Sequence, residues 1–185
     1  MKKLLLSALS LTALALSACG SSEPPASSTP EPPELTTTRT QDDAPAGRTF
    51  ELRLRGTNAQ GYDSVLVPLR SLEVTTPTGA PLQARMVART VDLTVQEQAY
   101  LVGQFFVPEG VSSVRVKLTF DDFGGWEQGK KAGALDTQVA PVSFEAPVDS
   151  LSQRGRAVLL LDVGKSLLSE GQEQRLMLPT LKVNY

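Results

Sequence analysis

The chain of 185 residues contains no histidine and only one cysteine, Cys19. The absence of histidine excludes Ser-His-Asp and Cys-His catalytic arrangements, and it also excludes histidine-ligated zinc, copper or non-haem iron. A single cysteine cannot form an intrachain disulfide, so burial alone must stabilise the folded part. Carboxylate chemistry, a serine–lysine pair or an oxygen-ligated ion remains possible.

An excess of basic residues is also lacking. Residues 48–185 hold 15 basic and 15 acidic residues, whereas residues 20–47 hold one base, Arg39, against five acids. A neutral domain offers no basic surface for nucleic acid or anionic lipid, so we expect no nucleic-acid partner. The length of residues 48–185 suits one domain with one core.

The first nineteen residues carry an export signal. Lys2 and Lys3 precede an apolar run over 4–16 that is too short to span a membrane as a helix. The ending Leu16-Ser17-Ala18-Cys19 resembles the lipobox of bacterial lipoproteins. This resemblance implies that the Cys19 thiol takes a diacylglycerol, that residues 1–18 are removed, and that the new amino group is acylated. The alternative is an ordinary secretory signal with an incidental cysteine.

The lipid on Cys19 is then the expected sole membrane attachment. Gly20 and Ser21 carry no acidic retention signal, so by resemblance to known sorting rules we expect the cell envelope, and the outer membrane in a cell with two membranes. Residues 20–47 are rich in Pro, Ser, Thr and Glu and predict a disordered tether, because they cannot bury enough surface to offset their ordering entropy. The predicted organisation is a signal peptide over 1–18, a lipidated cysteine and tether over 19–47, and a folded domain over 48–185.

Beyond Arg48, apolar and polar residues alternate with a period of two, which indicates strands with one buried face. The clearest case buries Val114, Val116, Leu118 and Phe120 on one strand. The predicted strands lie near 50–54, 64–75, 83–95, 99–107, 113–120, 138–146, 156–163 and 176–184, and only 165–170 looks helical. The pattern predicts an all-β fold, an antiparallel β-sandwich of about eight strands, with a small closed barrel as the alternative.

Several segments together resemble a family of bacterial lipoprotein domains of unknown function. The matching stretches are Thr90–Leu93, Phe106–Gly110, Val114–Leu118, Val158–Asp162 and Leu178–Val183. Two departures stand out, because Val111 replaces a tyrosine that is usual in the family and Gly164 replaces a second acidic residue after Asp162. The resemblance implies an all-β, surface-associated domain and no established activity.

The segment 121–127 is the most unusual part of the domain, with three carboxylates, two glycines and the only tryptophan. A loop of this composition could bind a ligand through Asp121, Asp122, Trp126 and Glu127. The alternating acidic pattern of a calcium loop is absent. The structural alternative is a hairpin connection in which Asp and Gly supply turn geometry and Trp126 packs on the edge of the sandwich.

Asp162 and the adjacent phenylalanines are further candidates. Asp162 follows an apolar strand and is either a buried acid held by Arg154 or Arg156 or the N-cap of the short helical turn. Phe105 and Phe106 must point to opposite faces of their strand, so one of them is expected to be more exposed.

No catalytic residues can be assigned. Lys165 and Ser166 are adjacent, so their side chains diverge, and no two acids have a spacing that predicts a catalytic pair. We expect no cofactor and no metal. The leading hypothesis is a lipid-anchored, non-catalytic module that binds a protein or glycan partner, followed by a structural envelope component and then by a carboxylate-based enzyme.

Overall fold

The computed structural model describes residues 45–169 and 173–185, and within them the all-β prediction is confirmed. The predicted signal peptide, Cys19 and most of the tether lie outside the described residues. The strands and helices, in chain order, are β1 Gly47–Thr57, β2 Ser64–Thr75, β3 Ala84–Met86, β4 Thr90–Asp92, β5 Tyr100–Pro108, β6 Ser113–Phe120, β7 Phe123–Gln128, β8 Lys131–Asp136, β9 Val142–Pro147, α1 Val148–Arg154, β10 Arg156–Asp162, α2 Val163–Ser166, β11 Leu167–Ser169, β12 Gln174–Met177 and β13 Leu181–Asn184.

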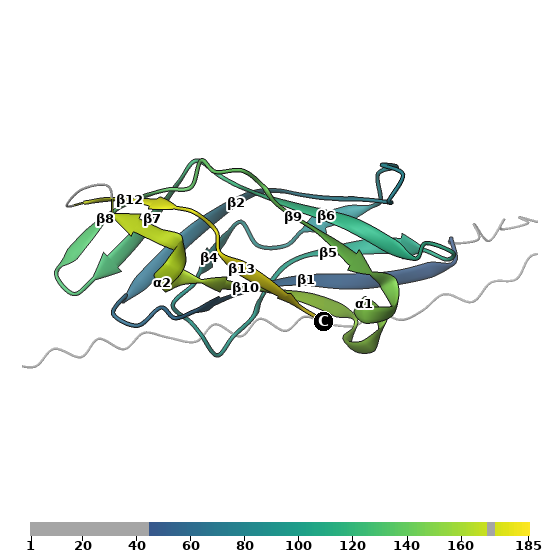
Figure 1. The fold of residues 1–185 in the computed structure, drawn as a ribbon, viewed down its shortest axis with the longest axis horizontal. Helices are drawn as coiled ribbons and strands as arrows, with labels where there is room; N and C mark the ends of the chain where they lie inside the picture. The colour runs from purple at the N-terminus through teal and green to yellow at the C-terminus, as the bar shows by residue number, and fades with distance from the viewer. Residues whose placement is uncertain (1–44, 170–172) are drawn as a thin grey trace, which may run out of the picture. The chain divides into compact units, whose positions relative to one another are not determined.

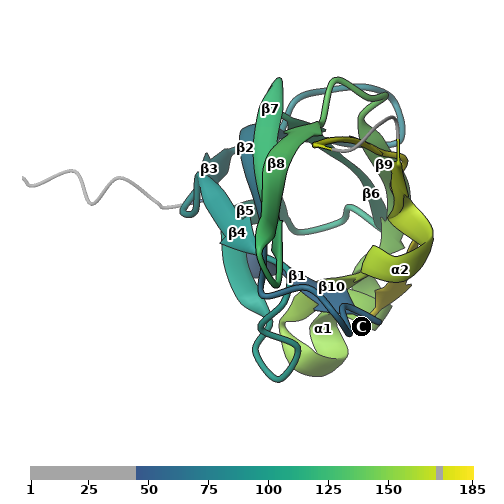
Figure 2. The same cartoon turned by 90° about the vertical axis from the view of Figure 1, so that its left-hand side faces the viewer.

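The strands form two sheets that are not closed into a barrel (Figures 1 and 2). The smaller sheet has the order β13-β10-β1-β5-β3, and the larger has the order β11-β12-β8-β7-β2-β6-β9 with β4 also paired to β2. Both are mixed rather than wholly antiparallel, because β10 runs parallel to β1 and β12 runs parallel to β8. The two strands of each parallel pair lie far apart in the chain, and a tight hairpin joins antiparallel strands only.

The inner faces of the two sheets supply the core. Val114, Val116, Leu118 and Phe120 of β6 are all buried, as their alternation predicted. Phe50 of β1 meets Phe105 of β5 with ring centroids 5.9 Å apart. Full burial of each large apolar side chain contributes about 1.5–3 kcal/mol. A one-residue slip would send the charged alternate positions inward, so this alternation determines the register.

Some predicted strands are divided in the structure. The stretch 83–95 forms β3 and β4, which pair with different sheets, and the stretch 176–184 is divided into β12 and β13 on either side of Pro179. A proline has no N–H for a central ladder, so it suits the change from one sheet to the other. The strand predicted over 138–146 begins later, at Val142.

The helical prediction over 165–170 is shifted in the structure. The helical turn is α2, which ends at Ser166, and β11 follows it. Asp162 is its N-cap, because its Oδ1 accepts from Lys165 N at 3.1 Å. Its Oδ2 accepts from Asn58 Nδ2 at 2.9 Å, so of the two predicted roles the N-cap is confirmed. The sequence pattern predicts no helix at α1, which ends at Arg154 with Gly155 as its C-cap at φ 69°.

The first strand begins at Gly47, one residue before the predicted start of the domain. Its entry is tied down by a hydrogen bond from Glu109 N to Ala46 O at 2.9 Å. No helix among residues 45–169 and 173–185 has the length and apolar character that crossing a membrane requires.

Candidate functional site

The predicted ligand loop is a bend between two strand pieces rather than a hairpin connection. The strand β6 pairs with the second half of β2, whereas β7 pairs with its first half, and both run antiparallel to it. Asp121 N donates to Pro68 O at 3.0 Å between these two pairings. A Cβ at Gly124 would come within 2.1 Å of Leu66 O, so a glycine allows the close approach of β7. The expected hairpin turn lies further on, at Gly129 between β7 and β8.

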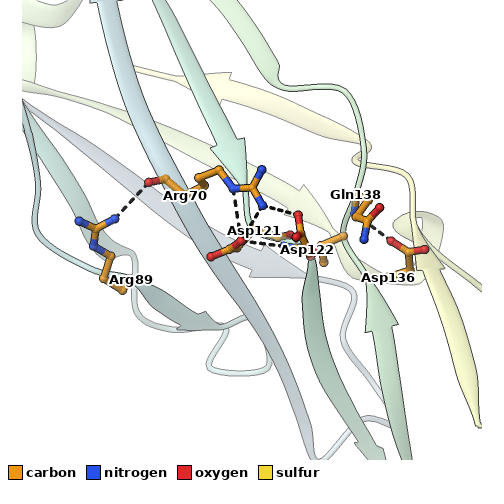
Figure 3. A network of polar contacts seen from close by, with 7 residues as sticks. Arg70, Arg89, Asp121, Asp122, Asp136 and Gln138 are labelled. Carbon is orange, nitrogen blue, oxygen red and sulfur yellow. Dashed lines mark hydrogen bonds and ion pairs between the residues drawn. The ribbon is translucent and has the colours of Figure 1, made fainter.

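Asp121 and Asp122 hold this bend through Arg70 (Figure 3). The Arg70 guanidinium donates to Asp121 Oδ1 at 2.8 Å and also contacts Asp122. The hydrogen bond from Arg70 lowers the pKa of Asp121, and the same contact raises the pKa of Arg70. All three side chains are about half exposed, so solvent screens the ion pairs. Thr137 Oγ1 donates to Asp121 O and ties the following connection to the bend.

Trp126 and Glu127 lie apart from these carboxylates. Trp126 is buried on the inner face of β7, with the Arg175 guanidinium carbon 4.2 Å from the centre of its ring. Arg175 also donates to Gln128 Oε1 at 3.0 Å. Glu127 points to the outer face and is exposed. The four predicted residues therefore form no single cavity, and no three acidic side chains among residues 45–169 and 173–185 are grouped to hold a metal ion.

Two smaller sequence predictions are confirmed. Phe105 is buried, whereas Phe106 on the opposite face is only half-buried. The side chains of Lys165 and Ser166 diverge. Ser166 is buried and its Oγ accepts from Thr180 N at 2.9 Å, while the Lys165 ammonium lies 3.7 Å from Asp162.

The outer face of the larger sheet carries an apolar surface that the sequence analysis missed. Residues opposite one another in register face the same side of a sheet. Leu168 lies opposite Leu176, Ala134 lies opposite Gly125, and Gly125 lies opposite Leu66. Phe123 is 59% exposed, and Leu66 and Leu168 are 44% and 45% exposed. We call this set the apolar band; its members are Leu66, Phe123, Ala134, Leu168 and Leu176.

Polar side chains lie within the apolar band and beside it. Asp136 lies in register between Leu176 and Phe123, and its Oδ1 accepts from Gln138 N at 2.9 Å. Arg70 pairs with Asp121 and Asp122, the two residues that precede Phe123 in the chain (Figure 3). Exposed apolar side chains gathered on one face together with polar groups are typical of protein–protein contact surfaces.

The outer face of the smaller sheet is different, because a groove of about 390 Å³ gathers four arginines there. Arg53 and Arg55 come from β1, Arg156 comes from β10, and Arg154 comes from the end of α1. We call this feature the arginine groove; its other lining residues are Glu97, Ala99, Val158, Leu160, Asn184 and Tyr185. The sequence analysis expected no basic surface from a neutral domain, and the arginine groove corrects that expectation, because the parallel pairing of β1 with β10 concentrates distant positive charges.

The arginines of the groove differ in their contacts. Arg53 Nε donates to Glu51 Oε2 at 2.8 Å, and its Nη1 donates to Ala99 O at 3.2 Å. The Nε atoms of Arg55 and Arg156 are buried and have no hydrogen-bond partner within the described part of the chain. The Nε edge of each guanidinium therefore faces the sheet, and neither guanidinium makes a hydrogen bond or ion pair within the described residues.

Comparison of the chain with protein-family models, curated proteins and solved structures finds no match. The resemblance to a lipoprotein domain family of unknown function therefore stays a prediction. The apolar band and the arginine groove are therefore the features of the molecule that bear on its function.

Proposed function

We propose that this chain is a lipid-anchored, non-catalytic β-sandwich of the cell envelope that binds a protein partner through the apolar band. The observation that carries the proposal is the alignment of exposed Leu66, Phe123 and Leu168 across the outer face of one sheet. Single exposed apolar residues are ordinary on a protein surface, but several on one face of one sheet favour a contact surface.

A protein partner suits this surface better than a glycan does. Glycan binding would be favoured by a row of exposed aromatic rings, and Phe123 is the one aromatic among the strongly exposed large apolar residues of the described chain. Leucine and alanine side chains on a pleated sheet instead offer the apolar contact area that protein interfaces bury at their centre.

The anchor in this proposal is Cys19. Three acyl chains contribute about 0.8 kcal/mol per buried CH₂, far more than the marginal hold of a single myristoyl group. Changing Cys19 to Ala in the full chain should leave an unprocessed precursor or a soluble form. Recovery of processed Cys19→Ala protein in the membrane fraction would contradict the anchor, and density-gradient recovery of the wild type with the inner membrane would contradict the outer-membrane assignment.

The partner is tested by crosslinking in intact envelopes, followed by purification of the full chain. We expect one discrete protein to be crosslinked to the wild type and to be lost with Phe123→Ser. The matched control is Val87→Ser, because Val87 is 49% exposed but lies outside the apolar band. Equal crosslinking with both variants would contradict the proposal that the apolar band binds the partner. Absence of any crosslinked protein would favour a structural envelope component without a specific ligand.

A further inference from the structure

The arginine groove has no role in the protein contact proposed above. Of its four guanidinium groups, only Arg53 has a carboxylate within 4.0 Å among the described residues, and that partner is Glu51. Glu97 is the one acidic side chain in the lining. Like charges gathered in a partly desolvated hollow repel one another, so folding alone does not explain the cluster. An anion in the groove would relieve the repulsion.

The register of the strands orders the groove along its length. Arg156 lies opposite Glu51, and Arg55 lies opposite Leu160, four residues further along β10. At about 3.3 Å per residue, this offset is roughly 13 Å along the strand. Arg53 lies opposite Val158 midway between these two points, and Leu160 lies beside Arg55. The arginine groove therefore has Arg156 and Arg55 towards its ends. Between them lie the apolar side chain of Val158 and Arg53, whose charge is paired with Glu51.

Each part of this arrangement matches a ligand group. A guanidinium binds a carboxylate or phosphate through two parallel hydrogen bonds, and an apolar floor favours hydrocarbon over water. A volume of about 390 Å³ suits a small molecule. We propose that the arginine groove is a binding site for a small amphipathic dianion, with a carboxylate or phosphate group at each end of a short apolar segment.

The local packing supports a preformed site. Arg55 and Arg156 are half-buried, and burial of their Nε atoms holds the guanidinium heads near the sheet. Less side-chain freedom is then lost when a ligand binds. The segment that contains Ala99 is hydrogen-bonded to Arg53 and forms a wall beside the floor.

Other anionic ligands fit this groove less well. A membrane surface is flat, whereas these arginines line a hollow. Nucleic-acid strands stack bases on aromatic rings, and Tyr185 is the one aromatic residue in the lining. Its hydroxyl already donates to Glu145 O at 3.1 Å.

The test is calorimetric titration of the purified full chain with suberate, an eight-carbon dicarboxylate. The monomethyl ester of suberate has one carboxylate and nearly the same length, and inorganic phosphate tests the charge without the spacer. Hexane-1,6-diyl bisphosphate tests the phosphate form of the dianion. We expect either dianion to bind at least tenfold more tightly than the monoester and inorganic phosphate.

Variants connect the binding to the groove. Arg55→Gln and Arg156→Gln should each weaken dianion binding at least tenfold, and Arg156→Lys should have a smaller effect because it keeps the charge but loses the planar fork. The matched control is Arg85→Gln, because Arg85 lies on β3 of the same sheet but outside the groove. Thermal unfolding of each variant in the absence of ligand checks that it is folded.

Three results would overturn the proposal. The first is binding of the dianions that is no tighter than that of the monoester, and the second is equal dianion binding by wild type and Arg156→Gln. The third is binding only to vesicles that contain anionic phospholipid. None of these results bears on the apolar band, whose test uses different residues.

Discussion

The outer faces of the two sheets differ in kind, although their inner faces are alike. Both inner faces are lined by buried aliphatic and aromatic side chains, such as Leu159 in the smaller sheet and Leu118 in the larger. The outer face of the smaller sheet gathers arginines around an apolar floor, whereas that of the larger sheet exposes leucine and phenylalanine.

The inner faces stabilise the fold, whereas the outer faces present surfaces to which a ligand can bind. The inner faces account for the fold, since burial there is nearly complete. A charged cluster and an exposed apolar band add little to folding, and each is disfavoured in isolation. Their presence on opposite sheets supports two surfaces of different chemistry on one scaffold.

The largest expected effect tests the division between inner and outer faces. Leu118→Ala should lower the free energy of unfolding by roughly 2–5 kcal/mol through lost burial and a cavity. Lys117→Ala on the same strand should change it by no more than about 0.5 kcal/mol, because Lys117 makes only an exposed ion pair with Glu73. Urea unfolding measures both values. Similar small effects at the two positions would contradict a half-buried strand.

A substitution on the inner face of β1 tests how closely the core packs compared with an outer face. Gly56 lies on β1, where a Cβ would come within 1.9 Å of Leu93 O, so Gly56→Ala must displace backbone. We expect a loss of about 1–3 kcal/mol in unfolding free energy from overpacking. Gly125→Ala beside the apolar band is the control, because its Cβ would lie 3.8 Å from the nearest atom, Gly133 O. Thermal unfolding measures both variants, and equal losses of stability would contradict the tighter packing at Gly56.

The pH dependence of stability tests the anchoring of β4 beside the apolar band. Burial alone would raise the pKa of Asp92, but hydrogen bonds from Thr94, Val65 N and Ser64 Oγ outweigh it and lower the pKa. The unfolded chain therefore binds this proton more tightly than the folded one. The stabilisation is complete above the ordinary aspartate value of about 3.9 and is lost as the pH falls below it.

Asp92→Asn should therefore lose roughly 1–3 kcal/mol near pH 7, through weakened hydrogen bonds, and should differ less from wild type near pH 2. Glu109→Gln serves as the control, since Glu109 is exposed in a turn. Urea unfolding between pH 2 and pH 7 gives the curves. A difference that stays constant over this range would show that the charge of Asp92 has no part in stability.

The smallest effects are expected from the outer faces themselves. Arg156→Gln and Phe123→Ser should each change the free energy of unfolding by no more than about 0.5 kcal/mol. Removing one positive charge from the arginine groove should slightly raise the free energy of unfolding at low salt, because it reduces repulsion between the arginines. Thermal unfolding at two salt concentrations measures this. A large loss of unfolding free energy in either variant would show that the substituted side chain contributes to the stability of the fold.

The predicted fold depended on residues whose pattern is local. The alternation in β6, the extent of β2 over 64–75 and the N-cap role of Asp162 follow from neighbouring residues, and the structure contains all three. Trp126 shows that local composition does not predict where a side chain lies in the fold. Its unusual neighbours predicted a ligand loop or a turn, whereas β7 places the ring in the core.

The sequence by itself determined the all-β class and the strands whose inner faces fill the core, because a period of two in hydrophobicity is a property of adjacent residues. Tertiary structure alone decided which outer surfaces form. Arg55 and Arg156 are a hundred residues apart in the chain, and only the parallel pairing of β1 with β10 brings them to one groove. Leu66 and Leu168 join the apolar band in the same way, through register across five strands. Pairing between distant strands depends on the packing of the whole core, so no local pattern contains it.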